Sequence, residues 1–249
     1  MTINIDTIPV NYIQMGAGEA VVMLHGWGAN AQLFEPCAQV IAQKYSVYAL
    51  DFPGFGGTPE PPAVWTVDDY TAFTVKWIEA LGLKKVILLG HSFGGRVIIK
   101  MANLKNLPFE IDKIILTDAA GIKPEKSAAQ EQKEKLSHVG KKLLKPFPGL
   151  VEKLQSMTGS ADYRAATPLM RKILVEVVNE DLTHLLPGVK QETLLIWGDL
   201  DTATPLSDGQ KMEEMMPNAG LAVMHGCTHF AFLDNPVQFA NILRVFLNI

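Results

Sequence analysis

The chain contains 249 residues with a hydrophobic fraction of 48%, which suits one compact domain with a large core and is unlike a disordered segment. Its formal net charge of −4 at pH 7 provides no general attraction to nucleic acid, so we expect a small-molecule substrate and no nucleic-acid partner. No apolar stretch reaches the length of about 18 residues that a membrane span requires. Whether the protein has a protein partner is left unknown by the sequence.

The N-terminus and the two cysteines favour a cytoplasmic protein. Residues 1–6 lack the basic region followed by an apolar region that begins a secretory signal peptide. Cys37 and Cys227 form no disulfide framework pattern, so we expect reduced thiols. No spacing of cysteine and histidine suggests zinc, and we expect neither a metal nor another cofactor.

Strands and helices are predicted to alternate over the first half of the chain. A stretch of alternating character that contains Pro9 favours two antiparallel strands at a sheet edge. Because short buried strands then alternate with helices, we expect an α/β fold with a mostly parallel, doubly wound sheet. The predicted elements are the edge pair over 2–15, strands over 20–24, 46–50, 86–89 and 113–118, and helices over 31–43, 67–81 and 93–104.

The pattern changes between residues 121 and 187, where several helices and no strand are predicted. Alternation then resumes, with strands over 191–197 and 220–224 and helices over 206–216 and 234–247. We therefore expect a core of residues 1–120 and 188–249, with a helical cap of residues 121–187 inserted after the sixth strand. Four apolar residues of this cap either line a substrate pocket or pack the cap on the core, namely Leu150, Met157, Leu169 and Met170.

A strand-to-helix turn carries the first candidate catalytic residue. Gly90, Ser92 and Gly94 spell G-x-S-x-G between the predicted strand and helix, which is the pattern of a nucleophile elbow. Small residues are needed on both sides because the serine backbone is strained and the chain packs closely. The backbone N–H of Phe93, at the start of the helix, would point toward a negative charge on a bound carbonyl oxygen.

A glycine-rich loop after the first buried strand is expected to supply a second oxyanion donor. The loop reads His25-Gly26-Trp27-Gly28, and its glycines allow the backbone to approach a ligand. We assign the donor to the backbone N–H of Trp27. His25 is interpreted as a residue that organises the loop and borders the substrate pocket.

Serine needs a general base, and the order serine, acid, histidine is expected in this type of fold. Among the later histidines, His229 follows the last predicted strand and can swing over the sheet edge to Ser92, whereas His225 ends that strand. His229 is therefore favoured as the base. Its neighbour Phe230 is expected to border the pocket.

The orienting acid has more than one candidate. Asp201 and Asp199 both follow the strand over 191–197, and Asp201 is favoured because it lies further into the loop. Asp118, at the end of another strand, remains a second candidate because ligand sites gather at the carboxyl ends of parallel strands. Asp51 is interpreted as a residue that stabilises a tight turn.

These motifs resemble those of the α/β-hydrolase fold superfamily, in its branch of esterase-like serine hydrolases with a helical lid. The similar segments are the H-G-x-x loop at 25–28, the D-x-x-G-x-G-x-S/T loop at 51–58, the elbow at 90–94, the W-G-x-x-D loop at 197–201 and the G-x-x-H loop at 226–229. Thr58 stands where serine is commoner. The resemblance implies Ser92 as nucleophile, His229 as base and then acid, and Asp201 as the orienting carboxylate, with Trp27 and Phe93 forming the oxyanion hole.

The resemblance leads to a functional expectation with two alternatives. We expect a serine hydrolase that cleaves carboxylic esters of small to medium, fairly apolar substrates through an acyl-enzyme, without a cofactor. The same triad could instead cleave a thioester, an amide or a carbon–carbon bond. A third interpretation is a hydrolase-like ligand receptor that acts in signalling. Haloalkane dehalogenases and epoxide hydrolases of this fold are disfavoured, because they carry aspartate where Ser92 stands.

Overall fold

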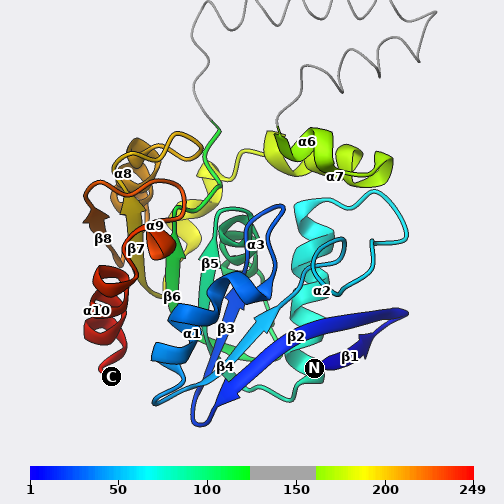
Figure 1. The fold of residues 1–249 in the computed structure, drawn as a ribbon, viewed down its shortest axis with the longest axis horizontal. Coiled ribbons are helices and arrows are strands. Elements are labelled where there is room, and N and C mark those ends of the chain that lie inside the picture. The colour runs from blue at the N-terminus through cyan, green and yellow to red at the C-terminus, as the bar shows by residue number, and fades with distance from the viewer. Residues whose placement is uncertain (124–160) are drawn as a thin grey trace, which may run out of the picture.

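A computed structural model describes residues 1–123 and 161–249 of the chain (Figure 1). Its centre is an eight-stranded sheet with the order β1-β2-β4-β3-β5-β6-β7-β8. β2 pairs antiparallel with β1 and β4, and the other neighbouring strands are parallel, so the expected mostly parallel sheet is confirmed. The strands are β1 (Thr2–Ile5), β2 (Ile8–Gly16), β3 (Ala20–Leu24), β4 (Ser46–Leu50), β5 (Lys85–His91), β6 (Glu110–Thr117), β7 (Glu192–Gly198) and β8 (Ala219–Met224).

Helices cover both faces of the sheet (Figure 1). On one face α1 contacts α10, and on the other face α2 contacts α3. The described helices are η1 (Ala31–Phe34), α1 (Glu35–Ile41), α2 (Val67–Ala80), α3 (Phe93–Ala102), α6 (Ala161–Ala165), α7 (Pro168–Asn179), η2 (Thr183–Gly188), α8 (Leu206–Met215), α9 (Ala231–Asp234) and α10 (Pro236–Leu247).

The central strands are continuously apolar because helices cover both faces of the sheet. All five residues of β3 are buried, and successive side chains point to opposite faces. Val21 and Met23 join the core that contains residues of α1 and α10. Val22 and Leu24 join the core that contains residues of α2, α3 and α8. A strand that is buried on both faces therefore needs apolar residues throughout.

One predicted helix is wrong in its details. The sequence predicts a single helix over 31–43, whereas the structure has a 3-10 turn, η1, followed by the short helix α1. Pro36 lies in the first turn of α1. Because proline has no N–H and its ring collides with the carbonyl four residues earlier, an α-helix cannot continue through this position from residue 31.

Two helices, α6 and α7, lie beyond the carboxyl ends of the strands, at the top of Figure 1. One of the helices predicted between residues 121 and 187 is present as α7, where the Thr167 side chain accepts a hydrogen bond from Met170 N and Pro168 occupies the first turn. Leu150 and Met157 lie outside the described residues. The division into a core and an inserted cap stays a prediction.

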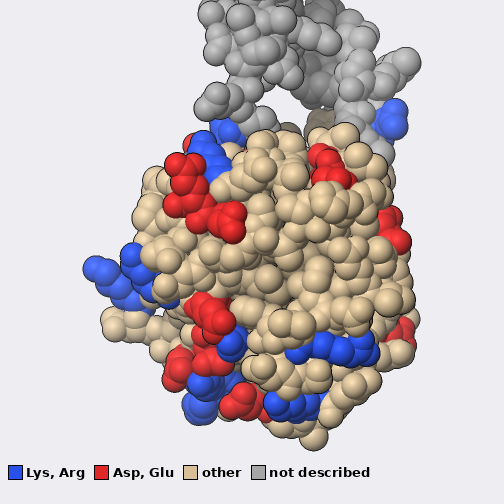
Figure 2. Space-filling model, turned by 90° about the vertical axis from the view of Figure 1, so that its left-hand side faces the viewer, with Lys and Arg blue, Asp and Glu red and all other residues tan. Residues whose placement is uncertain are grey.

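Charged side chains of both signs are scattered over the face at the β8 end of the sheet, and neither sign dominates it (Figure 2). None of the described helices is long and apolar enough to cross a membrane. Cys37 and Cys227 are both free and buried.

The helix after β5 lies very close to the end of β3. A Cβ atom added at Gly94 would lie 2.0 Å from the backbone oxygen of Leu24, far inside van der Waals contact. A Cβ at Gly90 would lie 2.6 Å from Ile98 Cδ1 and 2.9 Å from the Gly94 backbone. Glycine at these positions therefore allows α3 to start directly above the sheet.

We predict that Gly94→Ala lowers the free energy of unfolding by more than about 3 kcal/mol, because backbone must move to admit the methyl group. The matched control is Gly220→Ala, since a Cβ there meets nothing within 4 Å. Urea unfolding of both variants measures the effect. Equal stability of the two variants would contradict the close approach.

Candidate active site

The turn between β5 and α3 places Ser92 in a strained conformation. Ser92 has φ 48° and ψ −111°, a combination that costs a non-glycine residue about 1–3 kcal/mol. Its backbone N–H donates to Thr117 O at 3.3 Å, and its carbonyl accepts from Gly95 N at 3.0 Å and Ala120 N at 2.9 Å. These bonds fix the turn, so the serine side chain is held above the carboxyl edge of the sheet.

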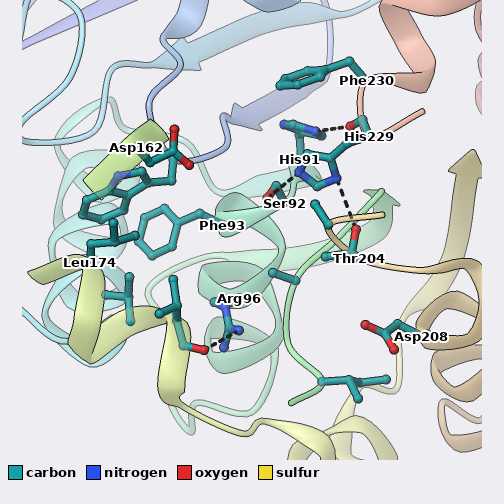
Figure 3. A pocket seen from close by; sticks show the side chains of 16 residues that line it. His91, Ser92, Phe93, Arg96, Asp162, Leu174, Thr204, Asp208, His229 and Phe230 are labelled. Atoms are coloured by element: carbon teal, nitrogen blue, oxygen red, sulfur yellow. Dashed lines mark hydrogen bonds between the residues drawn. The ribbon is translucent and has the colours of Figure 1, made fainter. Parts of the chain in front are cut away.

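His229 links Ser92 to Asp201 by two hydrogen bonds, of which Figure 3 draws the one to Ser92. Nε2 of His229 lies 3.0 Å from Ser92 Oγ, and its Nδ1 lies 2.8 Å from Asp201 Oδ2. His229 comes from the loop between β8 and α9, and Asp201 from the loop between β7 and α8. The structure thus brings together the three residues that the sequence favoured.

The Asp201 carboxylate is surrounded by donors. Its Oδ1 accepts from Ala203 N at 2.7 Å and Thr204 N at 3.0 Å, and its Oδ2 accepts from Thr204 Oγ1 at 2.7 Å. Burial alone would raise the pKa of Asp201, but the hydrogen bonds from His229 and Thr204 hold this pKa below its ordinary value. The carboxylate is therefore ionised and accepts a hydrogen bond from Nδ1–H of His229.

The alternative pair, Asp199 and His225, lies apart on the surface. His225 Nδ1 is 2.8 Å from Asp199 Oδ2, but the His225 side chain is 83% exposed. Asp199 also accepts a hydrogen bond from Gly226 N at 2.7 Å. This pair therefore holds the turns after β7 and β8 together and makes no contact with Ser92.

Asp118, the other candidate acid, is fully buried and does not touch His229. Its carboxylate accepts from Gly198 N at 2.9 Å and from Ala231 N at 3.2 Å, so it joins the loop that carries Asp201 to the loop that carries His229. Burial raises the pKa of Asp118 to about 6. Asp118 therefore stabilises the two loops and makes no hydrogen bond to the His229 imidazole.

Two supporting residues were not singled out from the sequence. His91 donates from Nε2 to the backbone oxygen of His229 at 2.8 Å, and burial lowers the pKa of His91 to about 3, so it stays neutral. Thr204 places its hydroxyl 3.3 Å from His229 Nδ1. His91 directly precedes Ser92, which was the available signal. The position of Thr204 depends on how its loop folds, so no pattern in the sequence indicated its role.

The loop that carries Trp27 packs directly on the elbow. A Cβ at Gly26 would lie 2.7 Å from His91 Nδ1 and 3.1 Å from Ser92 Cβ. The Trp27 ring makes an edge contact with the Phe93 ring at 5.7 Å between centroids. Phe93 is the first residue of α3, so its backbone N–H has no acceptor within the helix and is available to a ligand.

The structure places His25 in the interior and not at the cavity beside Ser92. His25 is completely buried, donates from Nδ1 to Gly26 O at 2.7 Å and accepts from Phe52 N at Nε2 at 3.0 Å. It packs against the rings of Phe52 and Phe55 and does not line the cavity beside Ser92. Its role in organising the loop agrees with these contacts. Burial lowers the pKa of His25 to about 4.

A cavity of about 450 Å³ opens beside Ser92 and is bordered by Trp27, Phe93, Leu174 and Phe230. Phe230 therefore lies where the sequence placed it. Leu169 and Met170 do not line this cavity. Met170 is 4% exposed and packs over Gly54, where an added Cβ would lie 2.4 Å from Met170 Cε. Leu169 packs against the core.

The described residues contain no group of three or more His, Cys, Asp or Glu side chains placed to hold a metal ion.

The buried His25 predicts a pH-dependent contribution to stability. Its pKa is about 4 when folded and 6.5 ordinarily, so the unfolded chain takes up the proton first. The stabilising contribution is present above pH 6.5 and is lost as the pH falls toward 4. We predict that the stability advantage of the wild type over His25→Gln shrinks by about 1.4 kcal/mol per pH unit below about pH 6.

Urea unfolding of both proteins between pH 7 and pH 5 measures this difference. Glutamine can still accept the Phe52 N–H, which limits the structural damage. Parallel curves for the two proteins would show that His25 is not held neutral.

The sequence profile of the alpha/beta hydrolase family matches residues 21–242. The chain belongs to the alpha/beta hydrolase family. It is 26% identical to a pimeloyl-[acyl-carrier protein] methyl ester esterase of Aliivibrio fischeri, over 97% of this chain and 98% of that protein.

Solved structures show the same fold. An esterase from Exiguobacterium antarcticum superposes with a TM-score of 0.76 at 25% identity, covering 98% of this chain and 97% of that chain. The enol-lactonase from Burkholderia xenovorans superposes with a TM-score of 0.78 at 16% identity, covering 100% of both chains. The expected superfamily is therefore confirmed.

Proposed function

We propose that this protein is an enzyme that hydrolyses carboxylic esters of small to medium size through an acyl-enzyme on Ser92. The observation that carries the proposal is the hydrogen-bonded series from Ser92 Oγ through His229 to the ionised Asp201. Family membership and the relatives named as esterases support the ester bond as the target. The ester in the name of the Aliivibrio protein is a methyl ester, which favours substrates with a small alcohol group.

In the acylation step, Ser92 Oγ attacks the ester carbonyl carbon while His229 Nε2 accepts the serine proton. Positive charge then develops on the imidazole, where the Asp201 carboxylate stabilises it through Nδ1–H. When the tetrahedral intermediate collapses, His229 returns the proton to the departing alkoxide. The alcohol leaves, and the acyl group remains on Ser92.

The negative charge on the carbonyl oxygen needs donors that are already in place. Phe93 N–H, free at the start of α3, and Trp27 N–H, in the loop packed on the elbow, are assigned this role. Removal of one such donor typically costs about 10²–10³ in kcat.

In the deacylation step, a water molecule takes the place of the alcohol. His229 accepts a proton from that water, the resulting hydroxide attacks the acyl carbonyl, and collapse returns the proton to Ser92 Oγ. The acid is released and the enzyme is restored. No cofactor is needed in either step. In this proposal residues 121–187 form a cap over the site.

We predict that Ser92→Ala and Asp201→Asn each lower kcat by at least about 10³-fold, because the first removes the nucleophile and the second the carboxylate that orients His229. The matched control is Asp199→Asn, which alters a similar aspartate–histidine pair on the surface and should change kcat less than about threefold.

Steady-state hydrolysis of p-nitrophenyl esters from acetate to decanoate provides the measurement. Repeated turnover by the wild type, lost in Ser92→Ala, supports the proposal, and the preferred chain length reports the depth of the pocket. A wild type that hydrolyses none of these esters would contradict it. The triad would then serve a thioester, an amide or a carbon–carbon bond, or a ligand receptor.

A further inference from the structure

Two buried charged side chains, Arg96 and Asp208, line the same cavity as Ser92 and take no part in the mechanism above (Figure 3). A third charged residue of the lining, Asp162, is exposed. Arg96 lies on α3, four residues after Ser92, and thus about 6 Å along the same face of the helix. Asp208 lies in the first turn of α8, beyond the loop that carries Asp201. In Figure 3, Phe93 and Leu174 lie on one side of Ser92 and Asp208 on the other, with Arg96 below. The exposed Asp162 lies on the side of Phe93 and Leu174, whereas the two buried charged groups lie below Ser92 and on its other side.

The Asp208 carboxylate borders the cavity and has no hydrogen-bond donor among the described residues. The residue is 9% exposed. Burial raises the pKa of Asp208 to about 6. At pH 7 the group is thus mostly ionised and offers only acceptors. At the wall of the cavity, such a group can accept a hydrogen bond from a bound ligand.

Arg96 has N–H groups that are not used by its hydrogen bonds within the described residues. It is 6% exposed and donates from Nη1 to Glu180 O at 2.6 Å and from Nη2 to Val178 O at 3.4 Å. A guanidinium has five N–H groups, so three have no acceptor among residues 1–123 and 161–249. Lys100, also on α3, forms ion pairs with Asp68 and Glu180.

Arg96 and Asp208 attract each other electrostatically without forming an ion pair. Both side chains line the cavity, so a group bound there can accept a hydrogen bond from the guanidinium and donate one to the carboxylate. A neutral amide does both. A carboxylate lacks the donor, and an alkyl chain lacks both, so neither satisfies Asp208.

We propose that Arg96 and Asp208 form a polar subsite that binds an amide or a similar neutral donor–acceptor group of the ester substrate. The subsite lies about one helical turn from the scissile carbonyl. This inference rests on the proposed esterase function, and it replaces the expectation of a fairly apolar substrate with one that carries a polar group.

The test compares matched esters, in which only the amide differs. For an amide in the acyl part, the pair is the p-nitrophenyl ester of N-acetyl-β-alanine and p-nitrophenyl hexanoate. For an amide in the alcohol part, the pair is 2-acetamidoethyl butyrate and pentyl butyrate, followed by acid release. In one of the two pairs, we expect kcat/KM for the amide ester to be about tenfold higher than for its alkyl counterpart. A difference of this size corresponds to one hydrogen bond to a charged group.

Asp208→Leu should reduce this ratio to about one, because the amide N–H then loses its acceptor. The ratio is measured on one protein sample, so a partly unfolded variant does not distort it. The matched control is Glu214→Leu, which replaces an exposed acid on the same helix and should keep the ratio.

The outcomes separate the two proposals. Hydrolysis that depends on Ser92 but shows no amide preference in either pair, or a preference that persists in Asp208→Leu, would overturn the polar subsite and leave the esterase function standing. Failure to hydrolyse any of the four esters would overturn both.

Discussion

The site depends on the close approach of α3 to the ends of β3 and β6. Ser92 must adopt a strained backbone to turn from β5 into α3, and that strain of about 1–3 kcal/mol has to be offset by the surroundings. Hydrogen bonds from the Ser92 backbone to residues after β6 and within α3 do this. Gly94 allows the approach because any side chain there would collide with Leu24 O. The same turn raises the serine hydroxyl and frees a helix N-terminal N–H beside it.

Buried polar groups then align three separate loops on this turn. His91 bonds to the backbone of His229, Asp118 bonds to the loops of both His229 and Asp201, and Thr204 contacts the Asp201 carboxylate. In a low-dielectric interior each of these bonds is strong, and each unpaired group would be costly. The imidazole is thereby held in one tautomer and one orientation. The chemistry depends on this alignment as much as on the nucleophile.

The sequence predicted the features that depend on local patterns. Apolar runs located the buried strands, and the G-x-S-x-G motif located the elbow. Asp201 and His229 were favoured over Asp199 and His225 because they lie further into their loops, and the structure places them beside Ser92.

Features that depend on contacts between distant segments could not be predicted. His25 looks like a loop residue facing a ligand, yet Phe52, 27 residues later, closes over it. The sequence left Met170 between lining the pocket and packing on the core, and only the structure shows its side chain over Gly54. Arg96 and Asp208 are 112 residues apart and face one cavity only because α3 and α8 pack on the same side of the sheet.

The most direct test of the proposed role of Ser92 is labelling with a p-nitrophenyl alkylphosphonate, which Ser92 Oγ attacks at phosphorus with loss of p-nitrophenolate. We predict one equivalent of p-nitrophenolate per chain and a phosphonyl group on the peptide that contains Ser92, and neither in Ser92→Ala. Labelling of another residue, or an active enzyme that takes up no label, would contradict it.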